Sequence, residues 1–406
     1  MSRLGPLRER EFRLLFAGRT ISMAGSAMAP IALAFAVLDL TGSKSDLGIV
    51  LAARQVPQVV FLLFGGVWAD RLPRHRIMVG SNVASGLSQG AVATLLLTHH
   101  ASIGALAAFA AVNGASTAFF FPASNGIIPQ TVPEPILQQA NAALRLALNA
   151  TSIGGAALGG IVVAAAGPGW GIAADAISFL LAAATLQAMR VRPPERTGAA
   201  SLLHELHEGW RDFWSRSWLW AIVIQFGLVN AVYGGALLVL GPAVAKASLG
   251  GATAWAIVLI GVQAGLICSG IVLLRWRPRH ILRIATLATF GFAVPLVTLA
   301  RPEALPVVVA GAFVAGACSE VFGVLWDTAY QQEIPRHMLS RLSAYDAFGS
   351  WVLMPVGYAA VGPLASVLGD RATYLGCAAL IVGASALTFL APGVRSLERA
   401  TARDTR

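Results

Sequence analysis

The sequence predicts an all-α membrane protein whose twelve transmembrane helices form two pseudo-symmetric bundles of six. Three observations predict this fold class. First, 56% of the 406 residues are hydrophobic and only 12% are charged, whereas soluble domains carry about 25% charged residues. Second, long apolar runs alternate with short basic loops along the whole chain. Third, the second half of the chain repeats a pattern of small residues and prolines that is found in the first half.

The chain contains twelve apolar runs, separated by Gly, Pro or charged residues. Each is about as long as, or longer than, the roughly 20 residues that a helix needs to cross a bilayer. The predicted spans cover residues 12–38, 46–69, 77–98, 102–128, 136–166, 170–189, 217–245, 253–274, 281–299, 304–330, 342–368 and 372–391. Because the runs are continuous and do not alternate with polar residues, they argue against a β-barrel. The run that starts at Phe12 is the first span, so we expect no cleavable signal peptide.

The basic residues outside the spans are divided unequally between the two sides of the membrane. When Arg13 and Arg283, at the ends of their spans, are counted with the loops, the side that holds the termini carries 22 of them. The opposite side carries four, which are Lys44, Lys246, Arg301 and Arg371. Because short basic loops stay in the cytoplasm, the sequence predicts that both termini are cytoplasmic. The formal net charge of +10 follows from this arrangement, and no nucleic-acid partner is expected.

The longest loop divides the chain into two sets of six spans. We expect an N-terminal bundle at 1–189, a cytoplasmic linker at 190–216, a C-terminal bundle at 217–394 and a cytoplasmic tail at 395–406. One face of the linker is apolar at helical spacing, and it consists of Leu202, Leu203, Leu206, Trp210, Phe213 and Trp214. This pattern predicts an amphipathic helix on the inner membrane surface, or a connecting helix that rests on the bundle.

An internal repeat supports the two halves. A shift of 202 residues pairs Gly114 with Gly316, Phe120 with Phe322, Gln130 with Gln332, Pro133 with Pro335, Leu137 with Leu339, Gly155 with Gly357 and Gly160 with Gly362. A nearby shift places Pro73-Arg74-His75 over Pro278-Arg279-His280. Parallel six-span repeats of this kind are used by one class of secondary transporters.

The second and third spans are joined by a short loop that combines small residues, one carboxylate and several arginines. Its candidate functional residues are Gly65, Gly66, Asp70, Arg71, Arg74 and Arg76. A carboxylate there can pair with arginines or with a helix N-terminus, and such contacts can be made in one conformation and broken in another. We therefore interpret the loop as a gate; the simpler interpretation is a basic membrane anchor.

The fifth span contains a run of small residues, in which Gly155, Gly159 and Gly160 form an antiporter-like motif. Small residues let helices approach closely in a membrane. The run resembles a signature of exporters in which Gly-Pro precedes two further small residues and Gly. Ala156 stands where the proline is expected, so the match is partial. Simple helix packing is the alternative.

Ionisable groups inside spans cost about 2.5–3.5 kcal/mol each on insertion scales, so they tend to face cavities. The candidates for proton coupling are Glu320, which is the first choice, Asp327 and Asp175. For Asp327 the alternative is a structural ion pair, and for Asp175 it is to brace Arg54 or Arg145. The basic residues within spans are Arg19, Arg54 and Arg145. Polar candidates for lining a cavity are Asn113, Asn149, Gln225, Asn230 and Gln263. For each polar residue, a hydrogen bond between helices is the alternative role.

No motif of metal or enzyme chemistry occurs in the sequence. Cys268, Cys318 and Cys377 lie in apolar spans without metal-ligand spacing. No phosphate-binding loop, zinc-protease motif or serine-nucleophile motif is present. We expect no enzyme activity, no metal and no cofactor.

Several segments resemble the major facilitator superfamily, and within it a bacterial efflux branch related to enterobactin exporters and macrolide-type efflux proteins. The resemblance covers residues 7 to 395 and includes the Gly65 to Arg76 loop, which resembles the family's loop between helices two and three. Its other segments are Phe12-Arg13-Leu14-Leu15, Leu40-Thr41-Gly42-Ser43, Phe121-Pro122-Ala123, Gln139-Ala140-Asn141-Ala142, Asp175-Ala176-Ile177-Ser178-Phe179, Leu325-Trp326-Asp327-Thr328 and Leu339-Ser340-Arg341-Leu342-Ser343-Ala344-Tyr345-Asp346.

This resemblance implies export of an amphipathic small molecule, such as a drug, an antibiotic or a siderophore-like metabolite, by proton antiport and alternating access. It also implies that several residues shape a central cavity, namely Pro122, Phe226, Tyr233, Phe292, Trp326 and Trp351; packing in the core is the alternative role for each. An importer of a small nutrient and a membrane sensor that transports nothing are the alternatives. The expected partners are the small-molecule substrate, protons and membrane lipids. We expect a monomer in the inner (plasma) membrane of a bacterium.

Overall fold

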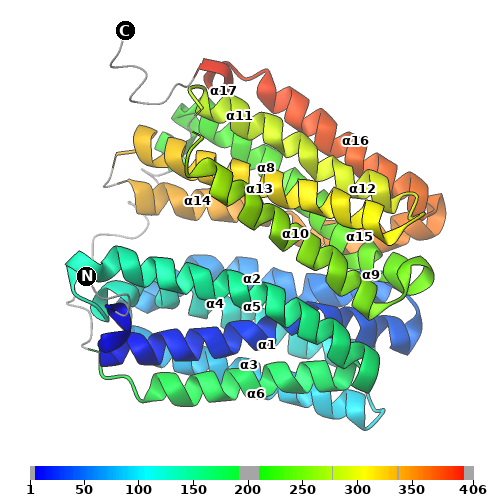
Figure 1. Cartoon of the computed structure of the whole chain (residues 1–406), viewed down its shortest axis with the longest axis horizontal. Coiled ribbons are helices and arrows are strands. Elements are labelled where there is room, and N and C mark those ends of the chain that lie inside the picture. Colours follow the sequence, from blue (N-terminus) through cyan, green and yellow to red (C-terminus); the bar gives the residue numbers. More distant parts are fainter. Residues whose placement is uncertain (1–4, 192–209, 277, 336–337, 397–406) are drawn as a thin grey trace. The chain divides into compact units, whose positions relative to one another are not determined.

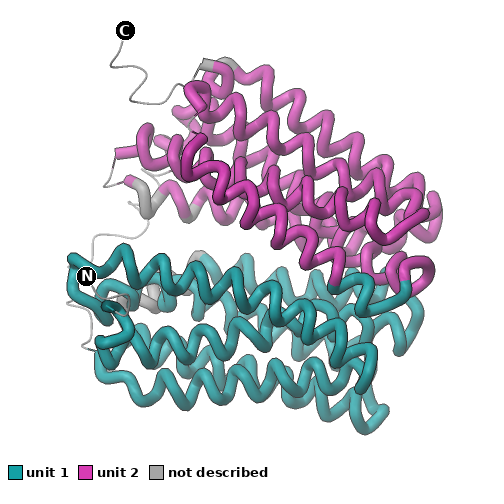
Figure 2. The backbone as a smooth tube through the Cα atoms, in the orientation of Figure 1, with its two compact units in different colours: residues 1–197, 250–256 teal, residues 198–249, 257–406 magenta. Residues whose placement is uncertain are grey.

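The structure is a computed structural model (Figure 1) that describes residues 5–191, 210–276, 278–335 and 338–396. Within these ranges it describes no side chains at 63–71, 339–341, 344, 392 and 396. The described part of the chain consists of helices and their connections and contains no strand. It forms two compact units, residues 1–197 with 250–256 and residues 198–249 with 257–406 (Figure 2).

Unit 1 contains six long helices. They are α1 (Arg10–Thr41), α2 (Lys44–Arg71), α3 (Arg74–Leu97), α4 (Ile103–Gly126), α5 (Leu137–Ala166) and α6 (Pro168–Gln187). The closest neighbours are α2 with α4, α3 with α6 and α1 with both α5 and α6. Short connections join them, and Gly42 has a φ of 67° in the turn between α1 and α2, a conformation that favours glycine.

Unit 2 repeats this plan with more interruptions. Its helices are α8 (Ser217–Gly235), η4 (Ala236–Leu240), α9 (Gly241–Val244), η5 (Ala245–Leu249), α10 (Ala252–Leu273), α11 (Ile281–Ala288), η6 (Thr289–Phe292), α12 (Ala293–Leu299), α13 (Leu305–Glu333), α14 (Leu339–Trp351), α15 (Met354–Leu368), α16 (Asp370–Phe389) and α17 (Pro392–Ser396). Two of these elements, η4 and η5, are π-helical.

All twelve predicted spans coincide with helical segments, with ends that differ by a few residues. Ten helices of the described chain are long and apolar enough to cross a membrane. Helix α3 is not among them because it carries polar residues, and Ser81, Asn82, Ser85 and Ser88 are buried where it packs on α4 and α6. The polar groups of α3 thus face protein and not lipid.

Three predicted spans of unit 2 are not continuous α-helices. The span at 217–245 passes through π-helical turns on either side of Pro242. The span at 281–299 contains a 3₁₀ turn at Thr289–Phe292, and the span at 342–368 is interrupted after Trp351, shortly before Pro355. Proline lacks the N–H that would continue the helix, which explains the breaks near Pro242 and Pro355.

Equivalent glycines of the repeat make equivalent contacts in the two units. A Cβ atom at Gly114 of α4 would collide with the backbone carbonyl of Arg54 in α2, and one at Gly316 of α13 would collide with the carbonyl of Val262 in α10. Glycine therefore lets the two helices of each pair touch backbone to backbone. The 202-residue shift that the sequence predicts has a physical counterpart in these two contacts.

Most of the predicted linker helix, residues 192–209, lies outside the described residues. Residues 210–215 are helical. Phe213 is buried in the core of unit 2, and its ring lies 6.1 Å from that of Tyr345 in α14. This end of the linker rests on its bundle, as the second interpretation of the pattern proposed.

Candidate functional site

A buried polar cluster in unit 1 surrounds Asp175 of α6, which is 1% exposed. Gln89 of α3 donates a hydrogen bond from Nε2 to its Oδ2 at 2.7 Å, and Ser26 of α1 donates from Oγ to its Oδ1 at 3.2 Å. Gly25 lies against Asp175 and Ser178, so α1 and α6 are in close contact beside the cluster. Three helices thus bring polar groups to one carboxyl.

Arg54 of α2 completes this cluster by its charge. It acts electrostatically on Asp175, but among the described residues no ion pair joins the two side chains. The Nε of Arg54 is buried and has no hydrogen-bond partner in the described structure. A buried acid and a half-buried base therefore lie near each other without direct pairing, which is unfavourable for charged groups removed from water.

The other arginines within the spans of unit 1 lie in different surroundings. Arg19 of α1 is half-buried and donates from Nη1 to the carbonyl of Ser124 in α4 at 3.4 Å. Arg145 of α5 is exposed, as is Asn149 one turn further along the helix. Asn113 of α4 is buried instead, and its Nδ2 has no partner in the described structure.

The predicted gate lies at the end of α2 and the start of α3. The backbone of Gly65, Gly66, Asp70 and Arg71 is helical, and their surroundings lie outside the described side chains. Arg74 donates from Nη1 to the carbonyl of Gly126, the last residue of α4. Arg76 is exposed. Of the gate residues whose side chains are described, Arg74 therefore links the start of α3 to the end of α4.

His75 lies in the same loop, ahead of the predicted third span. Burial lowers the pKa of His75, the charge of Arg76 lowers it further, and Glu11 opposes the shift. Glu11 also accepts a hydrogen bond from the backbone N–H of Arg190 at 2.8 Å, which ties the start of α1 to the segment after α6.

The small-residue motif of α5 makes close helix contacts. A Cβ atom at Gly155 would meet Ala27 and the carbonyl of Ala24 in α1, and one at Gly159 would meet Met28. Gly160 lies against Ala256 and the carbonyl of Ala252, which belong to the segment 250–256 of unit 1. These contacts account for the three glycines by packing alone.

Glu320 and Asp327 lie on α13 of unit 2. Glu320 is half-buried, and its carboxyl lies next to Gly270 of α10, where a side chain would touch it. Asp327 is exposed, two turns further along the helix. Both carboxyls belong to unit 2, whereas Asp175 belongs to unit 1.

Asp346 of α14 is an acidic residue within a predicted span that the sequence analysis did not select. Its Oδ2 accepts a hydrogen bond from Nε1 of Trp326 at 3.1 Å, and its Oδ1 accepts one from Oγ of Ser350 at 3.3 Å. Asp346 lies inside the predicted span 342–368, so the rule that selected Glu320 and Asp175 applies to it equally. Its position within an apolar run was the available signal.

Most of the polar cavity candidates of unit 2 form bonds between helices. Gln225 of α8 is 3% exposed and donates to Thr289 at 2.9 Å and to Ser385 at 3.0 Å. Asn230 donates to the carbonyl of Ser350 in α14 at 3.0 Å. Gln263 is half-buried on α10 beside Val262.

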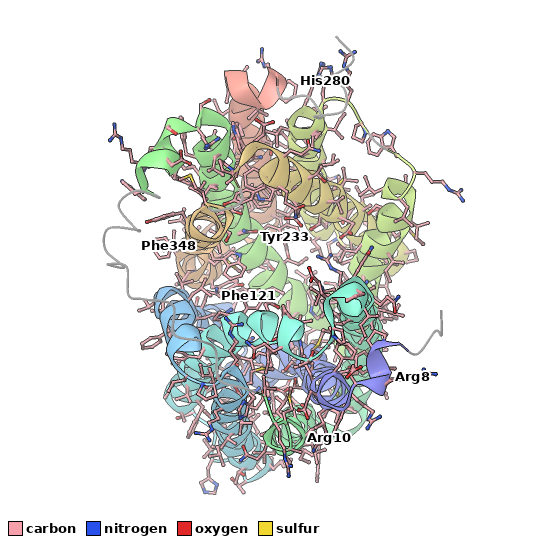
Figure 3. The ribbon with its side chains drawn as sticks, turned by 90° about the vertical axis from the view of Figure 1, so that its left-hand side faces the viewer. Arg8, Arg10, Phe121, Tyr233, His280 and Phe348 are labelled. Atoms are coloured by element: carbon pink, nitrogen blue, oxygen red, sulfur yellow. The ribbon has the colours of Figure 1, made fainter. Side chains whose placement is uncertain are left out.

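The aromatic candidates form a column of rings inside unit 2. Phe226 stacks on Phe322 with centroids 4.0 Å apart, and Phe322 stacks on Trp326 at 6.0 Å. Phe292 and Tyr233 extend the column from its other end, and Figure 3 places Tyr233 among the helices of this unit and His280 at its margin. The rings pack mainly on one another.

Trp351 is half-buried at the end of α14, and in unit 1 Pro122 is half-buried within α4.

In the described part of the chain, no group of three or more His, Cys, Asp or Glu side chains could hold a metal ion. The three cysteines are not paired with one another. Cys318 lies against Gly291 of the 3₁₀ turn in the ninth span, so its role there is packing.

Comparison with known proteins connects this geometry to a family. The sequence model of the Major Facilitator Superfamily matches residues 15–357. The multidrug efflux pump Tap of Mycolicibacterium fortuitum is 25% identical over 404 residues, which cover 96% of this chain and 97% of that protein. The enterobactin exporter EntS of Escherichia coli O1:K1 is 25% identical over 393 residues, which cover 93% of this chain and 91% of that protein.

Solved structures show the same fold at low sequence identity. The nucleoside transporter NupG has a TM-score of 0.74 and 12% identity, over 93% of this chain and 98% of that one. A bacterial homologue of the lysosomal transporter Spinster, in an inward-facing and occupied conformation, has a TM-score of 0.72 and 14% identity, over 94% of this chain and 97% of that one. Together with the two six-span units and their repeated glycine contacts, these matches show that the chain is a multi-pass membrane protein belonging to the major facilitator superfamily of transporters.

Proposed function

We propose that this protein is a secondary active exporter, which moves an amphipathic small molecule out of a bacterial cell across the inner membrane. Export and not uptake is supported by the full-length similarity to the efflux pump Tap and the exporter EntS. The driving reaction in this proposal is the entry of protons, and the two units alternately open one binding site to either side of the membrane. No covalent step is involved, and both termini lie in the cytoplasm.

The observation that carries the proton part of the proposal is the cluster around Asp175. Its carboxyl is held by two neutral donors, Gln89 and Ser26. Among the described residues, Arg54 is the charged group that acts on it, and the two do not form an ion pair. A carboxylate left without a paired cation inside a membrane protein is unfavourable, so either protonation of Asp175 or movement of Arg54 toward it relieves the arrangement.

These two ways of neutralising Asp175 exclude each other, and this is how the cluster couples proton binding to conformation. When Asp175 is protonated, Arg54 has no reason to approach it. When the proton leaves, the attraction between the carboxylate and the guanidinium draws α2 and α6 together at this level. The 202-residue shift pairs Asp175 with Cys377 in unit 2, so the repeat does not duplicate the carboxyl.

The proposal is tested by Asp175→Asn in purified protein reconstituted in liposomes with an imposed pH gradient. Asparagine keeps an oxygen for Gln89 and Ser26 but is neutral at every pH. We expect pH-driven movement of the dye rhodamine 6G to be lost, while binding of the dye to the protein persists. Transport that remains fully pH-driven would overturn the role of Asp175.

Two further measurements keep the outcome specific. Asp39→Asn changes an exposed acid at the end of α1 and is expected to leave pH-driven transport intact. Glu320→Gln tests another acid within the spans, and loss of pH dependence in this variant alone would move the proton site to α13. The direction is tested in cells, where expression of the protein should lower the intracellular dye; a rise would show uptake.

A further inference from the structure

Helix α5 carries a stripe of polar side chains along one face of its first half. The stripe consists of Gln138, Asn141, Arg145, Asn149 and Ser152. The residues recur at intervals of three and four, which places them on one side of an α-helix. Four of them are exposed and Ser152 is half-buried. This helix belongs to the membrane-spanning set, so an exposed polar face on it needs an explanation.

Two other faces of α5 have ordinary surroundings. One is buried in unit 1 and contains Ala140 and Leu144, which belong to the core cluster that includes Phe12 and Leu15. Another is apolar and exposed, and it contains Leu146 at 71% and Ile161 at 57% exposure. An exposed apolar face on a membrane helix is the face suited to lipid. The polar stripe lies to one side of it.

The C-terminal half of α5 shows what covers the face on which the polar stripe lies. Eleven residues along a helix return to the same face, because 11 residues make about three turns. Ala156, eleven residues after Arg145, is buried. Gly160, eleven residues after Asn149, lies against Ala256 and the carbonyl of Ala252 within unit 1. The face that carries the polar stripe is thus covered by protein further along and uncovered at the stripe, so we interpret it as the wall of a water-filled space.

Arg145 is the only charged member of the stripe, and in the described structure no acidic side chain pairs with it. A guanidinium remains protonated in proteins and carries donors in a planar fork that suits carboxylates. Asn141 and Asn149 lie one turn before and one turn after it, and their amides can both donate and accept. The acid within the spans of unit 1, Asp175, is bound elsewhere by Gln89 and Ser26.

We propose that Arg145, supported by Asn141 and Asn149, binds a carboxylate or similar anionic group of the exported molecule. This assignment rests on the proposed transport function and names the chemistry of its ligand: an amphipathic molecule with an acidic group. A positive charge on a water-exposed wall inside the membrane domain attracts an anion, and binding desolvates both partners and strengthens the charged hydrogen bonds.

The test uses a matched pair of dyes, rhodamine B, which has a free carboxylate, and its ethyl ester, in which the carboxylate is capped. Binding is measured by fluorescence with the full chain in nanodiscs of neutral phosphatidylcholine. We expect the wild-type protein to bind the acid more tightly than the ester. Arg145→Gln should weaken binding of the acid by about tenfold or more and leave binding of the ester nearly unchanged, and Arg145→Lys should recover part of the difference.

The matched control is Arg283→Gln, which removes an exposed arginine near the start of α11 and should change neither affinity. Equal binding of both dyes by the wild type, equal loss of both in Arg145→Gln, or no saturable binding of the acid would each overturn the assignment. A dependence on Arg145 that is seen only with phosphatidylglycerol in the nanodisc would assign the anion to lipid instead. Movement of the ester driven by a pH gradient is measured separately, so failure of the proposed exporter function is distinguished from failure of this site.

Discussion

The amide nitrogen of Gln225, a polar residue within a span, is hydrogen-bonded to the hydroxyl groups of Thr289 and Ser385. The amide of Gln225 donates to both hydroxyl groups, and Thr289 donates to Ser385 at 2.7 Å. The three residues come from α8, the 3₁₀ turn η6 and α16. Because all three are buried, the bonds replace water that is absent from this part of the molecule, and they join three helices at one level.

Thr289→Val should destabilise unit 2 because it removes a hydroxyl from this network and leaves the amide of Gln225 with one partner fewer. We expect the free energy of unfolding to fall by roughly 0.5–2 kcal/mol, measured as a lower melting temperature of the purified protein. Thr185→Val is the control, since the hydroxyl of Thr185 bonds only within its own helix, to the carbonyl of Leu181. Equal melting temperatures for the two variants would contradict the role of the network.

The sequence identifies Gln225 as a polar group within a span but not the direction in which its side chain points. Gln225 was a cavity candidate, and the structure shows it bonded inside the bundle; Asn149 was another, and it is exposed on the polar stripe. Both lie in apolar runs of similar composition. The face of a helix that meets its neighbours depends on packing between segments far apart in the chain, which a single sequence does not encode locally.

At the scale of helices, backbone contacts at glycine set how closely the elements approach. Gly114 and Gly316 each lie against a carbonyl of the neighbouring helix. In the same two helices, Gly104 and Gly323 have open space where a Cβ atom would stand. The structure therefore provides a tight and an open glycine on both α4 and α13, which separates the effect of packing from that of helix propensity.

Gly114→Ala and Gly316→Ala should each lower the free energy of unfolding by about 1–3 kcal/mol, because the new methyl group forces the helices apart. Gly104→Ala and Gly323→Ala should be neutral or slightly stabilising, since alanine favours helix by roughly 1 kcal/mol over glycine. Thermal unfolding of the four variants in one detergent measures the difference. Similar melting temperatures within each pair would show that the contacts are not tight.

The positions of the helices were predictable from hydrophobicity, but their interruptions were not. The run at 281–299 is mainly apolar, yet a 3₁₀ turn occupies Thr289–Phe292, where Thr289 bonds to Gln225 and Gly291 meets Cys318. These causes are contacts with other helices. In the eleventh span Pro355 gave a local signal, and the helix does break just before it.

At the scale of the whole molecule, the two units carry different charges within their spans. Away from the ends of the predicted spans, unit 1 has Arg19, Arg54 and Arg145 with the acid Asp175, whereas unit 2 has Glu320, Asp327 and Asp346. The glycine contacts between helices are repeated in the two units, but the charged residues within the spans are not. The proposed proton and anion sites both belong to unit 1, so we expect substitutions that alter coupling to concentrate there.

The proposed orientation of the molecule predicts which loops are accessible from outside the cell. In a variant with Ser at the three native cysteine positions, a membrane-impermeant maleimide should label His100→Cys, between α3 and α4, in intact cells. Glu134→Cys, between α4 and α5, should be labelled only after lysis. Both positions are exposed in the structure, so the difference reports the side of the membrane and not burial. The reverse labelling pattern would place the termini outside.

The glycine–carbonyl contacts also limit how the two halves of this duplicated unit can diverge. A clash between two side chains can be relieved by changing either partner, but every residue has a carbonyl, so no substitution at Arg54 or Val262 would make room for a side chain opposite. We therefore expect glycine to be retained at positions 114 and 316 even where the residues around them change. The bonds of Asp175 with Gln89 and Ser26, by contrast, are made by its side chain, and at such a position one half was free to acquire a task that the other never shared.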